Sequence, residues 1–138
     1  MSAGCATAKE TIRPQSSVIP KGVDWIKAYA ESVDPEQQRV TLSGGSSVDY
    51  DYLVVCPGIQ LNFDAVTGMA EAMRASAVSS NYVLDSTAKT WSNIQSTRSG
   101  TALFTMPAGP IKCAGAPQKI AYLAADYWRQ QGTLKGTR

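Results

Sequence analysis

A thiol-bearing loop between an apolar run and an amphipathic helix constrains this chain more than any other feature. Residues 102–106 are mostly apolar, and a stretch punctuated by glycine and proline follows them. Over residues 116–131, apolar side chains recur at the spacing of a helix with one buried face. These side chains are Ala116, Ile120, Leu123, Ala124, Tyr127 and Trp128. The pattern predicts a strand over residues 101–106, then a loop that presents Cys113, then a helix.

Cys113 is the candidate reactive group of that loop. Junctions between a strand and a helix are where α/β enzymes place groups that contact a ligand. Lys112 and Lys119 lie close by in sequence, and the N-terminus of the following helix carries partial positive charge. Both effects favour the thiolate over the thiol. The alternative is a small thiol that packs beneath a turn.

Composition narrows the class of protein. The chain has 138 residues and 43% hydrophobic residues, which suits a modest globular domain. Its net charge of +2 comes from scattered Lys and Arg, so no nucleic-acid partner is predicted. Histidine is absent from the sequence, which excludes a Cys/His nucleophilic pair within it. Three widely spaced cysteines indicate neither a disulfide framework nor a metal site. No signal peptide and no transmembrane run are predicted.

The remaining sequence predicts a β-meander, a buried strand and one further helix. Residues 1–17 are polar and are expected to be poorly ordered. The apolar run over residues 51–56 indicates a strand buried on both faces, which Pro57 and Gly58 end. The meander strands are expected at residues 23–33, 39–42 and 47–50, with turns at 34–38 and 43–46. Asp85 or Ser86 is expected to cap a helix that runs to Thr97, after a loop with one helical turn near residue 71.

Four blocks in the same order carry a family resemblance. They are residues 16–28 (SSVIPKGVDWIKA), 50–61 (YDYLVVCPGIQL), 79–91 (SSNYVLDSTAKTW) and 101–132, which contains KCAGAPQK. Together they resemble the central segment of sulfide:quinone oxidoreductases, which are two-dinucleotide-domain flavoproteins of the pyridine nucleotide-disulfide oxidoreductase superfamily. The resemblance implies an α/β fold, as a fragment of a FAD/NAD(P)-binding Rossmann-like flavoprotein. Residues 18–64 then belong to the FAD domain, 65–100 form a connection with one helix, and 101–138 begin the second dinucleotide-binding-like domain.

The resemblance also implies a chemistry. Cys113 corresponds to one of two redox cysteines beside the flavin. Hydrosulfide attacks the bridge between them, one becomes a persulfide, and Cys113 as thiolate passes electrons to FAD and then to quinone. The predicted cofactor-binding residues are Lys27, Ala28, Pro57, Gly58, Pro110 and Lys112. The implied substrates are hydrogen sulfide and quinone. The intact enzyme is expected at a bacterial cytoplasmic or mitochondrial inner membrane.

Features of the family that this sequence lacks point to a fragment. No strand–GxGxxG–helix pattern is present, and neither Cys5 nor Cys56 stands in the place of the second redox cysteine. The chain alone is therefore expected to be inactive without the missing N- and C-terminal parts. One alternative is a non-catalytic truncated gene product. Another is a fragment of a related flavoprotein, either a flavocytochrome sulfide dehydrogenase or a quinone-reducing NADH dehydrogenase. Cys56 is expected to pack in a core.

Overall fold

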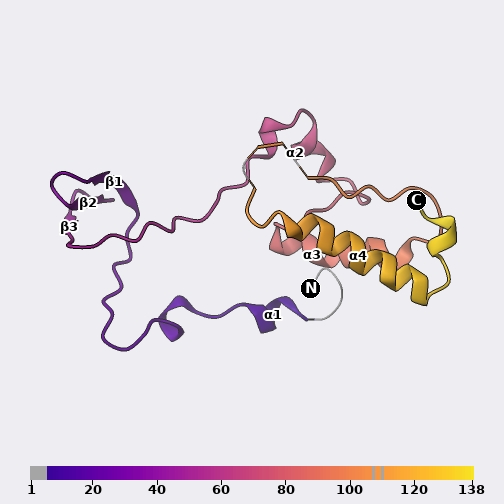
Figure 1. Ribbon diagram of the computed structural model, residues 1–138, viewed down its shortest axis with the longest axis horizontal. Coiled ribbons are helices and arrows are strands. Elements are labelled where there is room, and N and C mark those ends of the chain that lie inside the picture. The colour runs from indigo at the N-terminus through magenta and orange to yellow at the C-terminus, as the bar shows by residue number, and fades with distance from the viewer. Residues whose placement is uncertain (1–5, 107, 110) are drawn as a thin grey trace. The chain divides into compact units, whose positions relative to one another are not determined.

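The computed structural model describes residues 6–106, 108–109 and 111–138. It divides into two compact units (Figure 1). One unit is Arg13–Gly58, and the other comprises Ile59–Arg138 with the N-terminal residues up to Ile12. The mixed α/β content agrees with the predicted fold class, and the strands form one small antiparallel sheet.

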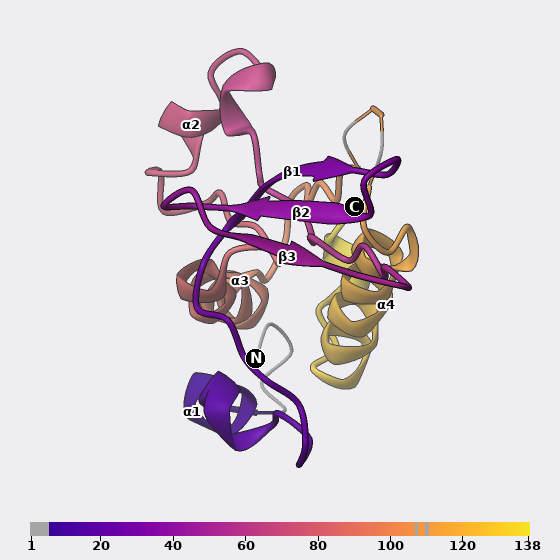
Figure 2. The same cartoon turned by 90° about the vertical axis from the view of Figure 1, so that its left-hand side faces the viewer.

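The unit Arg13–Gly58 contains the predicted β-meander. Strands β1 (Ala30–Asp34), β2 (Arg39–Leu42) and β3 (Ser47–Asp49) pair antiparallel in that order, with β2 in the middle (Figure 2). The first turn follows from an aspartate, because Asp34 Oδ1 accepts hydrogen bonds from the amides of Glu36 and Gln37 at 3.0 and 2.9 Å. A short 3₁₀ helix, η1 (Gln15–Ser17), precedes the sheet. The predicted first strand was too long, because residues 23–29 are irregular.

The sheet has little core of its own. Leu42 is its one buried residue, while Val33 and Val48 are 42% and 37% exposed. Arg39 and Asp49 pair across β2 and β3, with 2.6 Å between Nε and Oδ1, but both side chains are solvent-accessible. A three-stranded sheet without a packed layer gains little from apolar burial. Backbone pairing therefore carries much of its stability, to which this exposed ion pair adds little.

The prediction of a buried strand over residues 51–56 is wrong for this structure. The run is irregular, and Val54 and Val55 are 85% and 65% exposed. Cys56, which was expected in a core, is exposed as well. A strand buried on both faces needs hydrogen-bonding neighbours and a covering layer. The described residues supply neither, because the sheet ends at β3.

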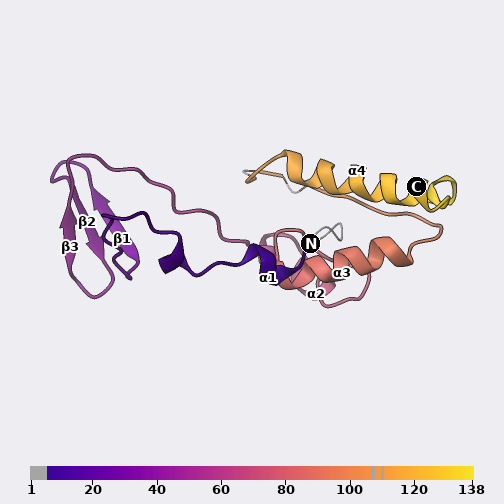
Figure 3. The same ribbon diagram turned by 90° about the horizontal axis from the view of Figure 1, so that it is seen from below.

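The unit around Ile59–Arg138 is built on two helices. Helices α3 (Leu84–Ser96) and α4 (Gly115–Gln130) lie side by side and run in the same direction (Figure 3). Their shared core consists of Ile94, Ile120, Ala124 and Trp128. The indole Nε1 of Trp128 donates a 2.8 Å hydrogen bond to the Ile94 carbonyl, so the largest core side chain also satisfies its polar atom. Both helices were predicted, and their bounds agree within three residues.

Short helical turns complete this unit. They are α1 (Ala8–Thr11), η2 (Phe63–Ala65), α2 (Met69–Ala72) and η3 (Leu134–Gly136). Helix α4 stops where predicted, because Gly132 adopts a φ of +72° that side-chain-bearing residues disfavour. The predicted cap of α3 was wrong: the helix begins after Val83, and Ser86 lies inside it as a buried residue.

The predicted strand over residues 101–106 is also absent from the described structure. This segment is irregular, and it pairs with the last residues of the chain through an isolated parallel bridge between Gly100 and Thr137 and a 2.7 Å hydrogen bond from the Ala102 amide to the Arg138 carbonyl. Ala102 and Phe104 contact the core, with the Phe104 ring 6.3 Å from that of Trp128, whereas Leu103 is 82% exposed. Of the predicted strand, loop and helix, the strand is therefore absent from the described residues, because no neighbouring strand forms a regular hydrogen-bonded pair with this segment. None of the described helices is long and apolar enough to cross a bilayer.

Candidate functional site

Cys113 lies immediately before the N-terminus of α4 and is exposed as a free thiol. Its φ is +60°, a left-handed conformation that costs a residue other than glycine about 1–2 kcal/mol. Its carbonyl accepts a 2.9 Å hydrogen bond from the amide of Ala116 in the first turn of α4. The thiol was predicted on a turn between a strand and a helix, and of these two elements the structure has the helix. Contacts around the thiol hold the unfavourable backbone conformation.

Tyr82 contacts this loop from the segment that leads into α3. Its hydroxyl donates to the carbonyl of Lys112 at 2.5 Å and approaches the carbonyl of Cys113 at 3.4 Å. Tyr82 stands two residues before α3 and is half-buried. Sequence reasoning assigned it no chemistry, because nothing in the pattern relates residue 82 to residue 112. The Cys113 loop is thus held from both sides, by Tyr82 and by α4.

A network of hydroxyl groups fixes the backbone around Tyr82. The amide of Tyr82 donates to Ser80 Oγ at 3.2 Å, and the amide of Ser80 donates to Ser86 Oγ at 3.0 Å. One turn further along α3, Thr90 Oγ1 bonds Ser79 Oγ at 2.8 Å. Tyr82 therefore projects from a segment that is tied to α3 at several points.

Lys89 ties the preceding loop to the same helix. Its ammonium donates to the carbonyls of Met73, Ala75 and Val78 at 2.9, 2.8 and 2.7 Å. The three N–H groups of this half-buried ammonium thus supply hydrogen bonds to carbonyls in α2's C-terminal cap and in the loop after it. Lys89 was not singled out from the sequence, because one lysine on an amphipathic helix resembles any solvated charge.

The two lysines near Cys113 in sequence are exposed in the structure. The contact that the structure gives Lys112 involves its carbonyl, and its ammonium has no acidic partner among the described residues. Lys119 lies exposed on α4. Pro110, which was predicted to shape the cofactor side of the loop, lies outside the described residues.

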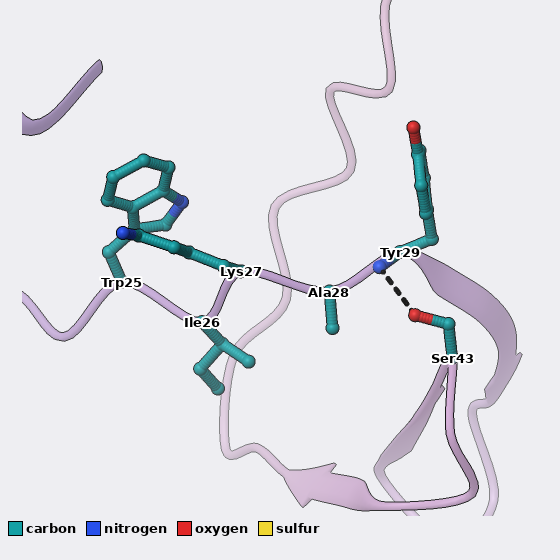
Figure 4. Close-up of a pocket in the computed structure, with 6 residues that line it drawn as sticks. All are labelled: Trp25, Ile26, Lys27, Ala28, Tyr29 and Ser43. Atoms are coloured by element: carbon teal, nitrogen blue, oxygen red, sulfur yellow. Dashed lines mark hydrogen bonds between the residues drawn. The ribbon is translucent and has the colours of Figure 1, made fainter. Parts of the chain in front are cut away.

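Two other predicted residues, Lys27 and Ala28, line an open hollow in the unit Arg13–Gly58 (Figure 4). The hollow measures about 380 Å³ and is lined by Trp25, Ile26, Lys27, Ala28, Tyr29 and Ser43. The Lys27 ammonium stands 4.7 Å from the centroid of the Trp25 ring. Tyr29 and Ser43 close one side, since the Tyr29 amide donates to Ser43 Oγ at 3.0 Å. The hollow offers an aromatic face and one cation on a solvent-exposed surface.

Pro57 and Gly58 are exposed and lie in the same irregular stretch as the run before them. Gly58 has a φ of +80°, a conformation that glycine adopts without steric cost. The predicted site residues are thus divided between the two units, with Lys27, Ala28, Pro57 and Gly58 in one and Lys112 and Cys113 in the other.

The described residues do not by themselves fit FAD. Binding of its pyrophosphate in a dinucleotide fold requires a strand, a glycine-rich turn and a helix N-terminus. Helix α4 follows an irregular loop instead of a paired strand, and the hollow beside Trp25 carries one cation without converging backbone donors. The described residues also hold no cluster of three or more metal-binding side chains.

Comparison with known proteins relates nearly the whole chain to one family. It is 38% identical over 130 residues to the mitochondrial sulfide:quinone oxidoreductase of Mus musculus and 41% identical over 130 residues to that of Dictyostelium discoideum. The identity to the enzyme of Schizosaccharomyces pombe is 36% over 133 residues. These matches cover 93–94% of the chain but only 28–29% of each relative. No family model matches the chain. The matches confirm the predicted resemblance to part of sulfide:quinone oxidoreductases.

Proposed function

We propose that this chain is part of a FAD-dependent sulfide:quinone oxidoreductase and that Cys113 is one of its two redox cysteines. The sequence relationship to three enzymes of that name supports the activity. The single observation that carries the site is the free, exposed thiol of Cys113, held at a φ of +60° before α4. Reactive cysteines have a sulfur that solvent and substrate can reach, as Cys113 does. Hydrogen bonds to the carbonyls of Lys112 and Cys113 hold the loop that carries it.

The reaction proposed for Cys113 is a thiol–disulfide exchange. In the oxidised enzyme, Cys113 Sγ is bonded to the sulfur of a second cysteine of the intact protein. The sulfur of hydrosulfide bonds to that second cysteine, the disulfide breaks, and its electron pair leaves with Cys113 Sγ as a thiolate. The second cysteine becomes a persulfide that keeps the hydrogen of hydrosulfide. FAD and quinone are the cofactor and the electron acceptor that we propose for the intact enzyme.

The exposed apolar runs support a role within a longer protein. Residues 51–56 and 101–106 have the composition of buried strands, yet several of their side chains face solvent. We propose that in the intact enzyme they join Rossmann-like sheets of the FAD domain and of the second dinucleotide-binding domain. Lys27, Ala28, Pro57, Gly58, Pro110 and Lys112 remain the proposed contacts to the cofactor. Association with the mitochondrial inner membrane, or a bacterial equivalent, is part of this proposal.

The test compares two cysteines in the intact enzyme, a polypeptide of the relatives' length that carries this chain. Cys113→Ser should abolish sulfide-dependent reduction of a soluble quinone while bound flavin stays unchanged. Cys56→Ser, which alters the other exposed thiol, should retain full turnover. Sulfide turnover by the Cys113→Ser enzyme would contradict the assignment.

The chain alone provides a second test. Mixed with excess FAD and desalted, it should retain no flavin absorbance and should not oxidise sulfide, because its described residues form no dinucleotide cradle. Flavin that remains bound would show that this chain holds the cofactor without the rest of the enzyme.

A further inference from the structure

The hydrogen bond from Tyr82 to the Cys113 loop has a consequence for the proposed reaction, on which this inference rests. We propose that Tyr82 is a positioning residue, which sets the direction of the Cys113 side chain by fixing the two peptide groups on either side of it. The hydroxyl of Tyr82 reaches both carbonyls concerned, that of Lys112 at 2.5 Å and that of Cys113 at 3.4 Å.

The geometry of the backbone explains why these two carbonyls matter. The Lys112 carbonyl belongs to the planar peptide group that joins residues 112 and 113, so its direction is coupled to φ of Cys113. The Cys113 carbonyl belongs to the next peptide group and is coupled to ψ of the same residue. Fixing both carbonyls therefore fixes the direction of the Cα–Cβ bond of Cys113, from which its sulfur projects.

Without these contacts, the backbone of Cys113 would relax to a more favourable conformation. Cys113 has a φ of +60°, and a non-glycine residue stays there only when its surroundings compensate the cost. Helix α4 fixes one side, through the 2.9 Å hydrogen bond from the Ala116 amide to the Cys113 carbonyl. Tyr82 supplies the contact on the Lys112 side.

Tyr82 is suited to this role because its own backbone is held. Its amide donates a hydrogen bond to Ser80 Oγ, and the Ser80 amide donates one to Ser86 Oγ. Ser86 is buried in α3. A half-buried phenol has few rotamers, so its hydroxyl arrives at the loop with little freedom. The segment before α3, which Ser86 anchors to that helix, thus fixes the loop before α4 through the side chain of Tyr82.

The test uses Tyr82→Phe in the intact enzyme, because this change removes the hydroxyl and keeps the ring. Turnover with saturating sulfide should fall roughly threefold to tenfold, the range expected for one lost hydrogen bond. The KM for quinone, the flavin content and the melting temperature should stay unchanged. Hydrogen exchange at the Ala116 amide should accelerate, while exchange in the middle of α3 should not.

Two further variants make the outcome decisive. Tyr122→Phe removes a hydroxyl from an exposed tyrosine on α4 and should leave turnover unchanged. Ser80→Ala removes the acceptor of the Tyr82 amide and should lower turnover in the same way but less, so it carries the test if Tyr82→Phe does not fold.

The outcomes separate this inference from the proposed function. If Cys113→Ser is inactive and Tyr82→Phe turns over at the wild-type rate, the positioning role is wrong and the redox role of Cys113 stands. If Cys113→Ser is active, the proposed function itself fails. If Tyr82→Phe loses turnover only together with flavin and thermal stability, and Ser80→Ala is unaffected, Tyr82 is a structural residue and the inference is overturned.

Discussion

The two units of this chain show how differently helices and strands depend on their neighbours. Helices α3 and α4 bury Ile94, Ile120, Ala124 and Trp128 between them, whereas the meander buries Leu42 alone. A helix satisfies its backbone hydrogen bonds internally and needs only one packed face. A strand needs partners at its edges and a layer on its face. The helical pair therefore has a core, while the apolar runs over residues 51–56 and 101–106 expose several of their side chains to solvent.

The two cysteines among the described residues differ in the same way, in how well their surroundings hold them. Cys56 lies on an irregular run with exposed neighbours, while Cys113 lies in a loop that is held by Tyr82 and by α4. Exposure alone therefore does not separate Cys113, the proposed redox thiol, from Cys56. The difference lies in the contacts that fix the backbone of Cys113.

The largest expected effect on stability comes from the helical core. Trp128→Ala should destabilise the unit around Ile59–Arg138 by about 3–5 kcal/mol, because a large buried ring and its hydrogen bond to Ile94 are lost. Tyr52→Ala in the other unit removes a side chain that is 94% exposed, and should change stability by less than about 0.5 kcal/mol. Urea denaturation followed by circular dichroism measures both. Equal effects would show that the helical pair is not the more stable region.

A smaller effect is expected at Lys89. Lys89→Met keeps the aliphatic stem but leaves the carbonyls of Met73, Ala75 and Val78 without their donor, which should cost about 1–3 kcal/mol. The matched control is Lys119→Met, which alters an exposed lysine on α4 and should be nearly neutral. The same denaturation experiment compares them. Neutrality at Lys89 would mean that the loop over residues 73–78 is not held by this side chain.

The smallest effect should be the response of the meander to acid. The hydrogen bond from Arg39 lowers the pKa of Asp49, and the charge of Arg39 adds to the shift. A lowered folded-state pKa stabilises the sheet above the unfolded value of about 3.9, and this contribution is lost as the pH falls through the folded pKa. Amide chemical shifts of β2 and β3 should therefore change below about pH 4. In Asp49→Asn this change should vanish, and its persistence would assign the acid response to another group.

The sequence predicted what depends on local pattern and missed what depends on distant partners. The apolar spacing of residues 116–131 sufficed for α4, and Asp34 with the Ser43–Ser46 turn sufficed for the meander. The runs over residues 51–56 and 101–106 were predicted as strands from composition, but a strand exists only where another strand pairs with it. Tyr82 could not be found, because its contact with residue 112 arises only when α3 and α4 pack.

The most direct test of the central claim maps the redox state of the two thiols. The intact oxidised enzyme is alkylated, then reduced and treated with a second, isotopically distinct reagent, and its peptides are identified by mass spectrometry. Cys56 should carry the first label, and Cys113 should carry the second because it was disulfide-bonded to another cysteine. Addition of sulfide before the first reagent should move Cys113 to the first label. A Cys113 that carries the first label without sulfide would contradict its role as a redox cysteine.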